Sequence, residues 1–371
     1  NVSRKWQRAV KRDVHMPGLY HADLDLKGGR RPHPFRLPSV KARELWDKDP
    51  TYFDLEGTQD LPGRVETSQN WRQHPLFKEA GLKAKPVTFY GDSIPYVANK
   101  HGKSGSLMCL FFSFPHRLPR DGSEQTEDFS DGAHSWMDDI HVFTVIRKED
   151  LTTKTMDEMW DILAWDMEGM LEGVFPTERH DGEAFRATDK YLKAVQGQSI
   201  AGGARFAIIQ LKQDWEHISS VYGFKSWSAT EFCPFCDARK DPPSWFLEGH
   251  AAHWRQTLWD KDKLAQALSG QLVLADGRVS DKMKWASHLW KIPHMDISYI
   301  KADPMHVLFV GGVVNKVMGE LLHNMLVKRH DLAGRALEAR VAHAWERIAA
   351  HYHGKAPPLH QMTANTFIPS R

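Results

Sequence analysis

Two aspartates follow apolar segments in a way that is typical of metal-dependent enzymes. Asp92 ends the run PVTFYGD, and Asp214 follows the run RFAIIQLKQ. Two-metal phosphoryl-transfer sites need carboxylates from different segments, because two cations about 4 Å apart must be bridged by acids. Open α/β sheets place their chemistry at strand ends. The spacing alone fits equally well an Asp92 in a turn and an Asp214 that caps a helix N-terminus.

A cysteine pair provides a second set of candidate ligands. Cys233 and Cys236 form the motif CPFC, and His250 and His253 follow in GHAAH, giving C-x2-C-x13-H-x2-H. This spacing favours a structural zinc site over a redox dithiol, because a redox CxxC opens a helix and this one follows a loop rich in Trp and Ser. The two residues between the histidines are fewer than the usual three to five, which leaves one histidine open to being a bystander.

A third candidate group opens a long apolar segment at 303–330. Asp303 and His306 occur in ADPMHVL, one helical turn apart, and Glu320 is the only acid in the rest of that segment. Asp303 followed by Pro304 also fits a simple helix start. Glu320 lies fourteen residues after His306 and returns to nearly the same helical face. A buried glutamate needs a partner or a metal ion.

The order of the predicted elements positions these acids. Apolar runs at 86–92, 106–114 and 141–147 predict three strands, and an apolar stripe over 151–175 predicts a helix capped by Thr152 or Thr153. A fourth strand is predicted over 201–211, just before Asp214. This order is similar to the start of the RNase H-like α/β fold, whose first and fourth strands each carry a metal-binding acid.

Composition limits the remaining choices. The chain has 371 residues, 41% of them hydrophobic, and a formal net charge of +2, which is ordinary for a globular protein. We find no apolar window long enough to span a membrane, and three cysteines cannot build a disulfide framework. We therefore expect a soluble intracellular protein with no membrane contact.

Four regions are expected from the changes in sequence pattern along the chain. Residues 1–84 read as a basic, loosely structured N-terminal region, and residues 85–232 as the first part of the RNase H-like core. Residues 233–300 read as the Cys/His zinc segment with a helical insertion. Residues 301–371 read as the buried D-x-x-H helix followed by a C-terminal helix.

Taken in order, the motifs resemble a DDE/D transposase of the CACTA/Mirage/Chapaev type, including the CACTA and Plavaka branches. The resemblance rests on GDSIPY, QDWEHISSVYGFKSW, CPFC, the GH of His250 and DPMHVLFVGGVVNKVMGELL, and it covers roughly residues 70 to 330. It implies DNA strand cleavage and transfer by two Mg²⁺ or Mn²⁺ ions held by Asp92, Asp214 and a third acid. It also implies His306 as an orienting or DNA-contacting residue, a Zn²⁺ site, DNA as the partner with self-association open, and a nuclear location.

The chain departs from that family at the third acid. The resemblance implies a glutamate downstream of D-x-x-H, for which Glu320, Glu338 and Glu346 are candidates, unless the acid lies beyond Arg371. Without it, the chain would be a transposase fragment or an inactive copy. The competing hypothesis is therefore a domesticated, transposon-derived nucleic-acid-binding or structural zinc protein without catalysis. A zinc hydrolase is a more distant third, because a closed four-ligand site leaves no position for water.

Overall fold

The computed structural model describes residues 18–53, 71–97, 104–115, 140–226, 228–240, 252–274, 277–280, 283, 286–303 and 339. Contacts divide the chain into two units, Asn1–Ala302 and Asp303–Arg371. Every helix and strand named below belongs to the first unit. The helices predicted for 303–330 and 331–353 lie outside the described residues, apart from Asp303 and residue 339.

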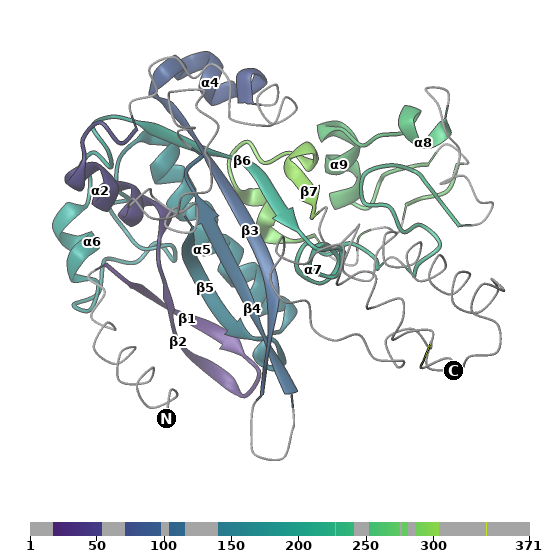
Figure 1. Ribbon diagram of the computed structural model, residues 1–371, viewed down its shortest axis with the longest axis horizontal. Coiled ribbons are helices and arrows are strands. Elements are labelled where there is room, and N and C mark those ends of the chain that lie inside the picture. Colours follow the sequence, from purple (N-terminus) through teal and green to yellow (C-terminus); the bar gives the residue numbers. More distant parts are fainter. Residues whose placement is uncertain are drawn as a thin grey trace. The chain divides into compact units, whose positions relative to one another are not determined.

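A five-stranded mixed sheet forms the centre of the first unit (Figure 1). Its strands are β3 (Ala84–Val97), β4 (Ser104–Ser113), β5 (His141–Arg147), β6 (Arg205–Gln213) and β7 (Ile300–Ala302), and they lie in the order β5-β4-β3-β6-β7. The pairs β3/β4 and β4/β5 are antiparallel, whereas β3/β6 and β6/β7 are parallel. The three-strand meander, the helix and the returning parallel strand expected from the sequence are thus confirmed as an α/β arrangement.

Helix α5 (Thr153–Glu172) connects the meander to β6 and packs on one face of the sheet. Thr152 caps it, since its side chain accepts from the backbone N–H of Thr155 while the Thr155 hydroxyl accepts from the N–H of Thr152. Gly173 ends it in the left-handed conformation with φ of 78°. The buried apolar stripe of α5 joins inward side chains of the sheet in the main core; these include Val87, Phe89, Phe206, Ile208 and Leu211.

A β-hairpin and a helix precede the sheet. The helix lies where SVKARELWDKD predicts one, whereas the hairpin was not expected in a region predicted to be loosely structured. Strands β1 (Tyr20–Leu26) and β2 (Gly29–Phe35) pair antiparallel, and α2 (Pro38–Lys48) follows. In β1 every second side chain, from Tyr20 to Leu26, is buried in the main core. The physical reason is the period-two alternation in YHADLDL, which the richness in Pro, Gly and Arg around it obscured. Strand β2 tolerates Pro32 and Pro34 because it pairs with β1 alone.

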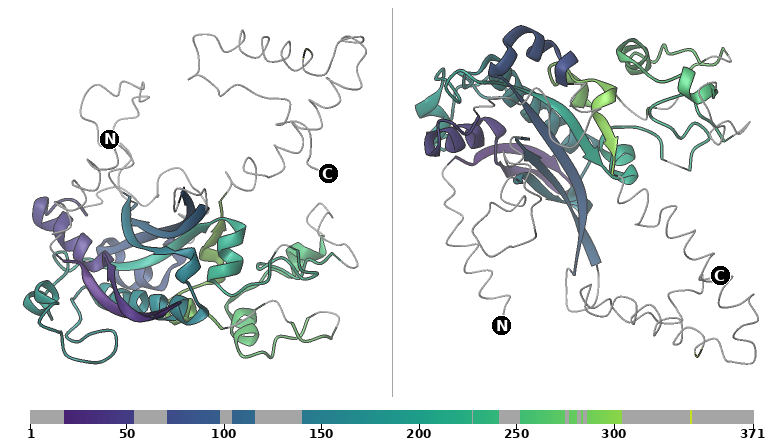
Figure 2. Two further views of the ribbon diagram at one scale, coloured as in Figure 1. Left: turned by 90° about the horizontal axis from the view of Figure 1, so that it is seen from below. Right: turned by 45° about the horizontal axis from the view of Figure 1, so that its top comes forward.

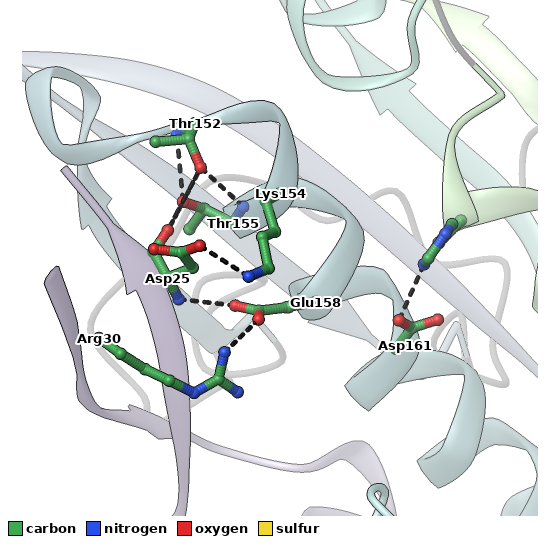
Figure 3. Close-up of polar contacts among 8 residues, drawn as sticks. Asp25, Arg30, Thr152, Lys154, Thr155, Glu158 and Asp161 are labelled. Carbon is green, nitrogen blue, oxygen red and sulfur yellow. Dashed lines mark hydrogen bonds and ion pairs between the residues drawn. The ribbon is translucent and has the colours of Figure 1, made fainter.

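Polar contacts fasten the hairpin to the start of α5 (Figure 3). Glu158 on α5 accepts hydrogen bonds from the backbone N–H of Asp25 at 2.6 Å and from the guanidinium of Arg30 at 2.5 Å. Lys154 pairs with the Asp25 carboxylate at 2.9 Å. Together with the buried side of β1, these contacts place the hairpin and α5 on the same face of the sheet (Figure 2).

The opposite face is covered only in part by the described elements. Helix α4 (Pro75–Ala80) packs at the beginning of β3 and β6 through a small second core; its buried members are Trp71, Leu76, Ala84, Ala207 and Ile209. Further along this face, Phe111, Tyr90 and Lys212 are partly exposed. The face opposite α5 is therefore apolar and covered where β3 and β6 start, and it is more polar toward the ends of these two strands.

The remaining elements are short. They are α6 (Lys190–Val195), α7 (Trp215–Val221), α8 (His253–Gln256), α9 (Lys261–Leu268) and the 3-10 turns Gly81–Lys83, Lys148–Asp150, His288–Lys291 and Ile297–Tyr299. The amphipathic pattern over 244–259 predicts a longer helix, of which the described part is helical only at 253–256. The pattern over 282–291 also predicts a helix, but the described part of this stretch contains a single 3-10 turn.

Candidate active site

The two predicted aspartates follow paired residues on adjacent parallel strands. Gly91 on β3 is the register partner of Gln213 on β6, and Asp92 and Asp214 are the next residues of the two chains. Because neighbouring strands lie about 4.8 Å apart, the two aspartates occupy adjacent backbone positions. The sequence predicted convergence of these two acids, and the register brings their backbones together.

Asp92 lies inside its strand, whereas the sequence placed it at the strand end. Strand β3 continues to Val97 and stays paired with β4, where Cys109 lies opposite Asp92. The extension arises because β4 is long enough to provide partners past Asp92, although Pro95 interrupts the apolar pattern. The alternative interpretation of Asp92 as a turn residue is therefore wrong.

The Asp92 carboxylate is held locally. It accepts a hydrogen bond from the backbone N–H of Ser93 at 2.6 Å and a longer one from the hydroxyl of Tyr90 at 3.3 Å. Asp92 is half-buried. Burial, and secondarily the nearby charge of Asp92, raises the pKa of the Cys109 thiol to about 11, so Cys109 stays neutral beside the carboxylate.

Asp214 has the helix-capping role that the sequence left open beside a place in a metal site. It is the N-cap of α7, and its carboxylate accepts a hydrogen bond from the N–H of His217 at 2.5 Å. It also directly follows Gln213, the register partner of Gly91 on β3. The carboxylate therefore sits at the positive end of a short helix, where negative charge is favoured. His217 itself is buried, and desolvation, with a smaller effect of the Lys148 charge, lowers its pKa to about 3.

The two strands approach closely beneath the aspartates. A Cβ added at Gly91 would lie 2.1 Å from Oε1 of Gln213, a distance that real side chains do not tolerate. Gln213 is fully buried, and neither polar atom of its amide has a hydrogen-bond partner among the described residues. Only glycine at position 91 leaves room for this amide, so the Gly91–Gln213 pair determines how closely the two acid-bearing strands pack.

A third aspartate follows the same row on β7. Ala302, the last residue of β7, pairs with Gln213, and Asp303 is the next residue of the chain. Asp303 is buried and is the first residue of the second unit. The other members of this predicted group, His306 and Glu320, and the alternative acids Glu338 and Glu346 lie outside the described residues.

The cysteine pair forms a separate local cluster. The Sγ atoms of Cys233 and Cys236 lie 3.3 Å apart without a disulfide, and Cys236 is buried. For comparison, tetrahedral zinc with Zn–S bonds of about 2.3 Å would hold two sulfurs about 3.8 Å apart. His250 lies outside the described residues, and so does the side chain of His253, which begins α8. The predicted zinc ligands are therefore described only for the two thiols.

Aromatic side chains pack around the cysteine pair. The ring of Trp215 makes an edge contact with Phe235 at 6.3 Å between centroids. Trp259 is buried, donates from its backbone N–H to the carbonyl of Phe235 and donates from its indole to Asp237. These two tryptophans follow the packing role expected from the sequence.

The register also reveals residues that the sequence interpretation missed. Each aspartate of the row is preceded two positions earlier by a polar residue with a long side chain, in YGD, KQD and KAD. These residues, Tyr90, Lys212 and Lys301, are themselves register partners across β3, β6 and β7. The repeated tripeptide pattern was the available signal, but it becomes meaningful only when the three strands are aligned.

Among the residues that the structure describes, no three His, Cys, Asp or Glu side chains are grouped so as to hold a metal ion. Within the same residues, no helix has the length and apolarity needed to cross a bilayer. Comparison of the chain with protein-family models and with curated proteins finds no match.

Proposed function

We propose that this protein has an RNase H-like fold and cleaves and transfers DNA strands by two-metal phosphoryl transfer, as a DDE/D transposase does. The observation that carries the proposal is the placement of Asp92 and Asp214 directly after the register pair Gly91–Gln213. Carboxylates on adjacent strands are the arrangement that two bridged hard cations require. The sheet supports it further, since Asp92 lies on β3 and Asp214 directly follows β6, and these are the first and fourth strands of the sheet in chain order.

The resemblance implies that the third carboxylate lies downstream of D-x-x-H, with Glu320 as the first candidate. We propose Asp92 and Asp214 as metal ligands, and Asp303, His306 and Glu320 as further members of the site on the strength of that resemblance.

Bound Mg²⁺ or Mn²⁺ would lower the pKa of a coordinated water or 3′-hydroxyl and neutralise charge on the attacked phosphate. The residues of this chain would hold and orient those ions. Asp214 is suited to this because its carboxylate is oriented by the first turn of α7 through the N–H of His217. Asp92 is oriented similarly by the N–H of Ser93.

The test measures metal binding and nicking together. The full chain is titrated with Mn²⁺ by electron paramagnetic resonance and incubated with supercoiled plasmid in Mg²⁺ or Mn²⁺. Wild type is expected to bind Mn²⁺ and to nick the plasmid. Asp92→Asn and Asp214→Asn are expected to lose both, because each removes a charged ligand and leaves the backbone contacts of the side chain available.

Glu216→Gln is the matched control, because Glu216 lies two residues from Asp214 but is exposed. It should nick at the wild-type rate. Nicking that persists in both asparagine variants, or a wild type that binds no Mn²⁺, would contradict the proposal. Asp303→Asn and Glu320→Gln, assayed in the same way, identify the third ligand.

The second candidate function is a nucleic-acid-binding or structural zinc protein of transposon descent without catalysis. The close approach of the Cys233 and Cys236 thiols favours it, because binding of zinc by these thiols does not require Asp92 and Asp214. Zinc content per chain, measured by mass spectrometry for wild type and Cys233→Ser, tests the metal site. A chain that holds one zinc, binds DNA and never nicks would support this candidate over the enzyme.

A further inference from the structure

A row of aromatic and basic side chains runs across the sheet next to the aspartates. Tyr90 on β3 pairs with Phe111 on β4 and with Lys212 on β6, and Lys212 pairs with Lys301 on β7. We call these four residues the aromatic–lysine row. All four belong to the first unit of the chain, and they come from four strands that are consecutive in the sheet.

The aromatic–lysine row lies on the same face as the aspartates. Residues two apart on a strand point to the same side, about 7 Å apart, so Tyr90 shares a face with Asp92 and Lys212 with Asp214. The intervening residues, Gly91 and Gln213, face the buried interior together with Phe89 and Leu211.

The side chains of the row suit a nucleic-acid strand. The rings of Tyr90 and Phe111 are stacked, with centroids 6.3 Å apart and planes inclined by 27°. All four side chains are partly exposed. Aromatic rings stack on bases without regard to sequence, and lysines bind phosphates as point charges.

We propose that the aromatic–lysine row is a binding subsite for a single DNA strand. The subsite would hold the part of the strand next to the phosphate that is attacked at Asp92 and Asp214. Lys212 and Lys301 contact one backbone phosphate, and the ring of Tyr90, supported by Phe111, stacks on the adjoining base. This assignment rests on the proposed function for the identity of the substrate, but its binding chemistry is independent of catalysis.

The experiment measures binding of the full chain to a fluorescent single-stranded DNA oligonucleotide by anisotropy, in Ca²⁺ and in EDTA, over a range of KCl concentrations. Lys212→Gln and Lys301→Gln are each expected to weaken binding. The double variant removes both cations from the phosphate that they share and should reduce the magnitude of the salt slope by about 0.7, the value for one phosphate contact on a single strand, and each single variant should reduce it by less. Lys212→Arg should restore the slope. Lys193→Gln on α6, an exposed lysine outside the sheet, is the matched control and should change neither quantity.

Two variants of Tyr90 separate base stacking by the ring from the contact of the hydroxyl, which donates a hydrogen bond to the Asp92 carboxylate. Tyr90→Phe keeps the ring and should bind DNA as wild type does. Tyr90→Leu removes the ring and is expected to weaken binding about tenfold, the lower part of the range for one stacked base. Circular dichroism and thermal unfolding identify any variant that fails to fold, and Lys212→Arg then remains as the folded comparison.

The outcomes distinguish this subsite from the proposed catalysis. If asparagine variants of the aspartates stop nicking while both lysine variants bind with the wild-type salt slope, the enzyme stands and the subsite is wrong. If no form nicks DNA but the lysine variants lose salt slope, the subsite stands without catalysis. A wild type that binds no single-stranded DNA overturns the inference. So does a wild type that prefers duplex DNA or RNA, if the lysine variants keep its salt slope.

Discussion

Gly91 and Gln213 are register partners on β3 and β6, and the amide of Gln213 fills the space that a side chain at position 91 would need. This contact lies directly before Asp92 and Asp214 in both strands. The distance between the two acid-bearing strands is therefore coupled to a glycine whose backbone conformation is ordinary for any residue. Position 91 requires glycine because there is no room for a Cβ atom, and not because the backbone has a positive φ.

We expect Gly91→Ala to destabilise the protein by about 1 to 3 kcal/mol, because the added methyl group overpacks against the buried side-chain amide of Gln213. Urea unfolding measures the change. Gln213→Ala in the same chain removes the clash, so the double variant should lose less than the sum of the single variants, with a coupling energy of about 0.5 to 3 kcal/mol. Additive losses would show that Gln213 is not what excludes a side chain at position 91.

Substitutions of Asp214 should separate its helix cap from its charge. Asn is as good an N-cap as Asp, so Asp214→Asn should unfold within about 0.5 kcal/mol of wild type, whereas Asp214→Ala should lose about 0.5 to 2 kcal/mol. Both variants should lose metal binding, because neither carries a carboxylate. Unfolding in urea with and without Mn²⁺ measures both effects. A Mn²⁺-stabilised Asp214→Asn would argue against a ligand role for this residue.

Asp166 should make stability fall as the pH rises through neutrality. Asp166 is fully buried on α5 and accepts from the N–H and the hydroxyl of Ser39, yet burial raises its pKa to about 7. Because the pKa is higher in the folded state than the ordinary 3.8, its contribution is complete below about pH 4 and is lost as the pH rises through about 7. The full loss is at most about 4 kcal/mol.

The measurement compares wild type with Asp166→Asn in urea at pH 5 and pH 8. The difference isolates Asp166 from the buried histidines, whose lowered pKa values act in the opposite direction, since their effect is a loss of stability as the pH falls below about 6.5. Wild type should lose more stability than the variant between pH 5 and pH 8. Equal pH dependence in the two proteins would show that Asp166 does not titrate in this range.

Asp189 should be far more important for stability than a surface acid. Its carboxylate pairs with Arg179, both side chains are almost completely buried, and the Arg179 guanidinium also lies 4.9 Å from the ring centre of Tyr20. Asp189→Asn removes the closer of the two carboxylates that pair with the buried Arg179 guanidinium and leaves only Asp181, at 3.5 Å, so it should cost about 3 kcal/mol. Glu216→Gln, which breaks an exposed pair with Lys148, should cost less than about 1 kcal/mol in the same urea unfolding assay.

Local sequence patterns were sufficient to predict strands β3, β4, β5 and β6 of the sheet, but not the three-residue strand β7. The apolar runs before and after Asp92 and the run before Asp214 are strands, and Thr152 caps α5 as its sequence predicts. These features depend on the periodicity of side chains and on backbone N–H groups within a few residues, and both are readable from one segment. The hairpin of residues 20–35 carries the same kind of signal in YHADLDL but was hidden by its neighbouring prolines and arginines.

Only the tertiary structure decided which residues stand beside one another across the sheet. The sequence by itself determined that Asp92 and Asp214 follow apolar strands; the pairing of Gly91 with Gln213, and of Gln213 with Ala302, placed three Asp-containing tripeptides in line. Register is set by contacts between segments that are far apart in the chain, and a shift of one residue would move every side chain to the other face. No local pattern encodes that choice, because it depends on how the glycine of one strand and the glutamine of another share one space.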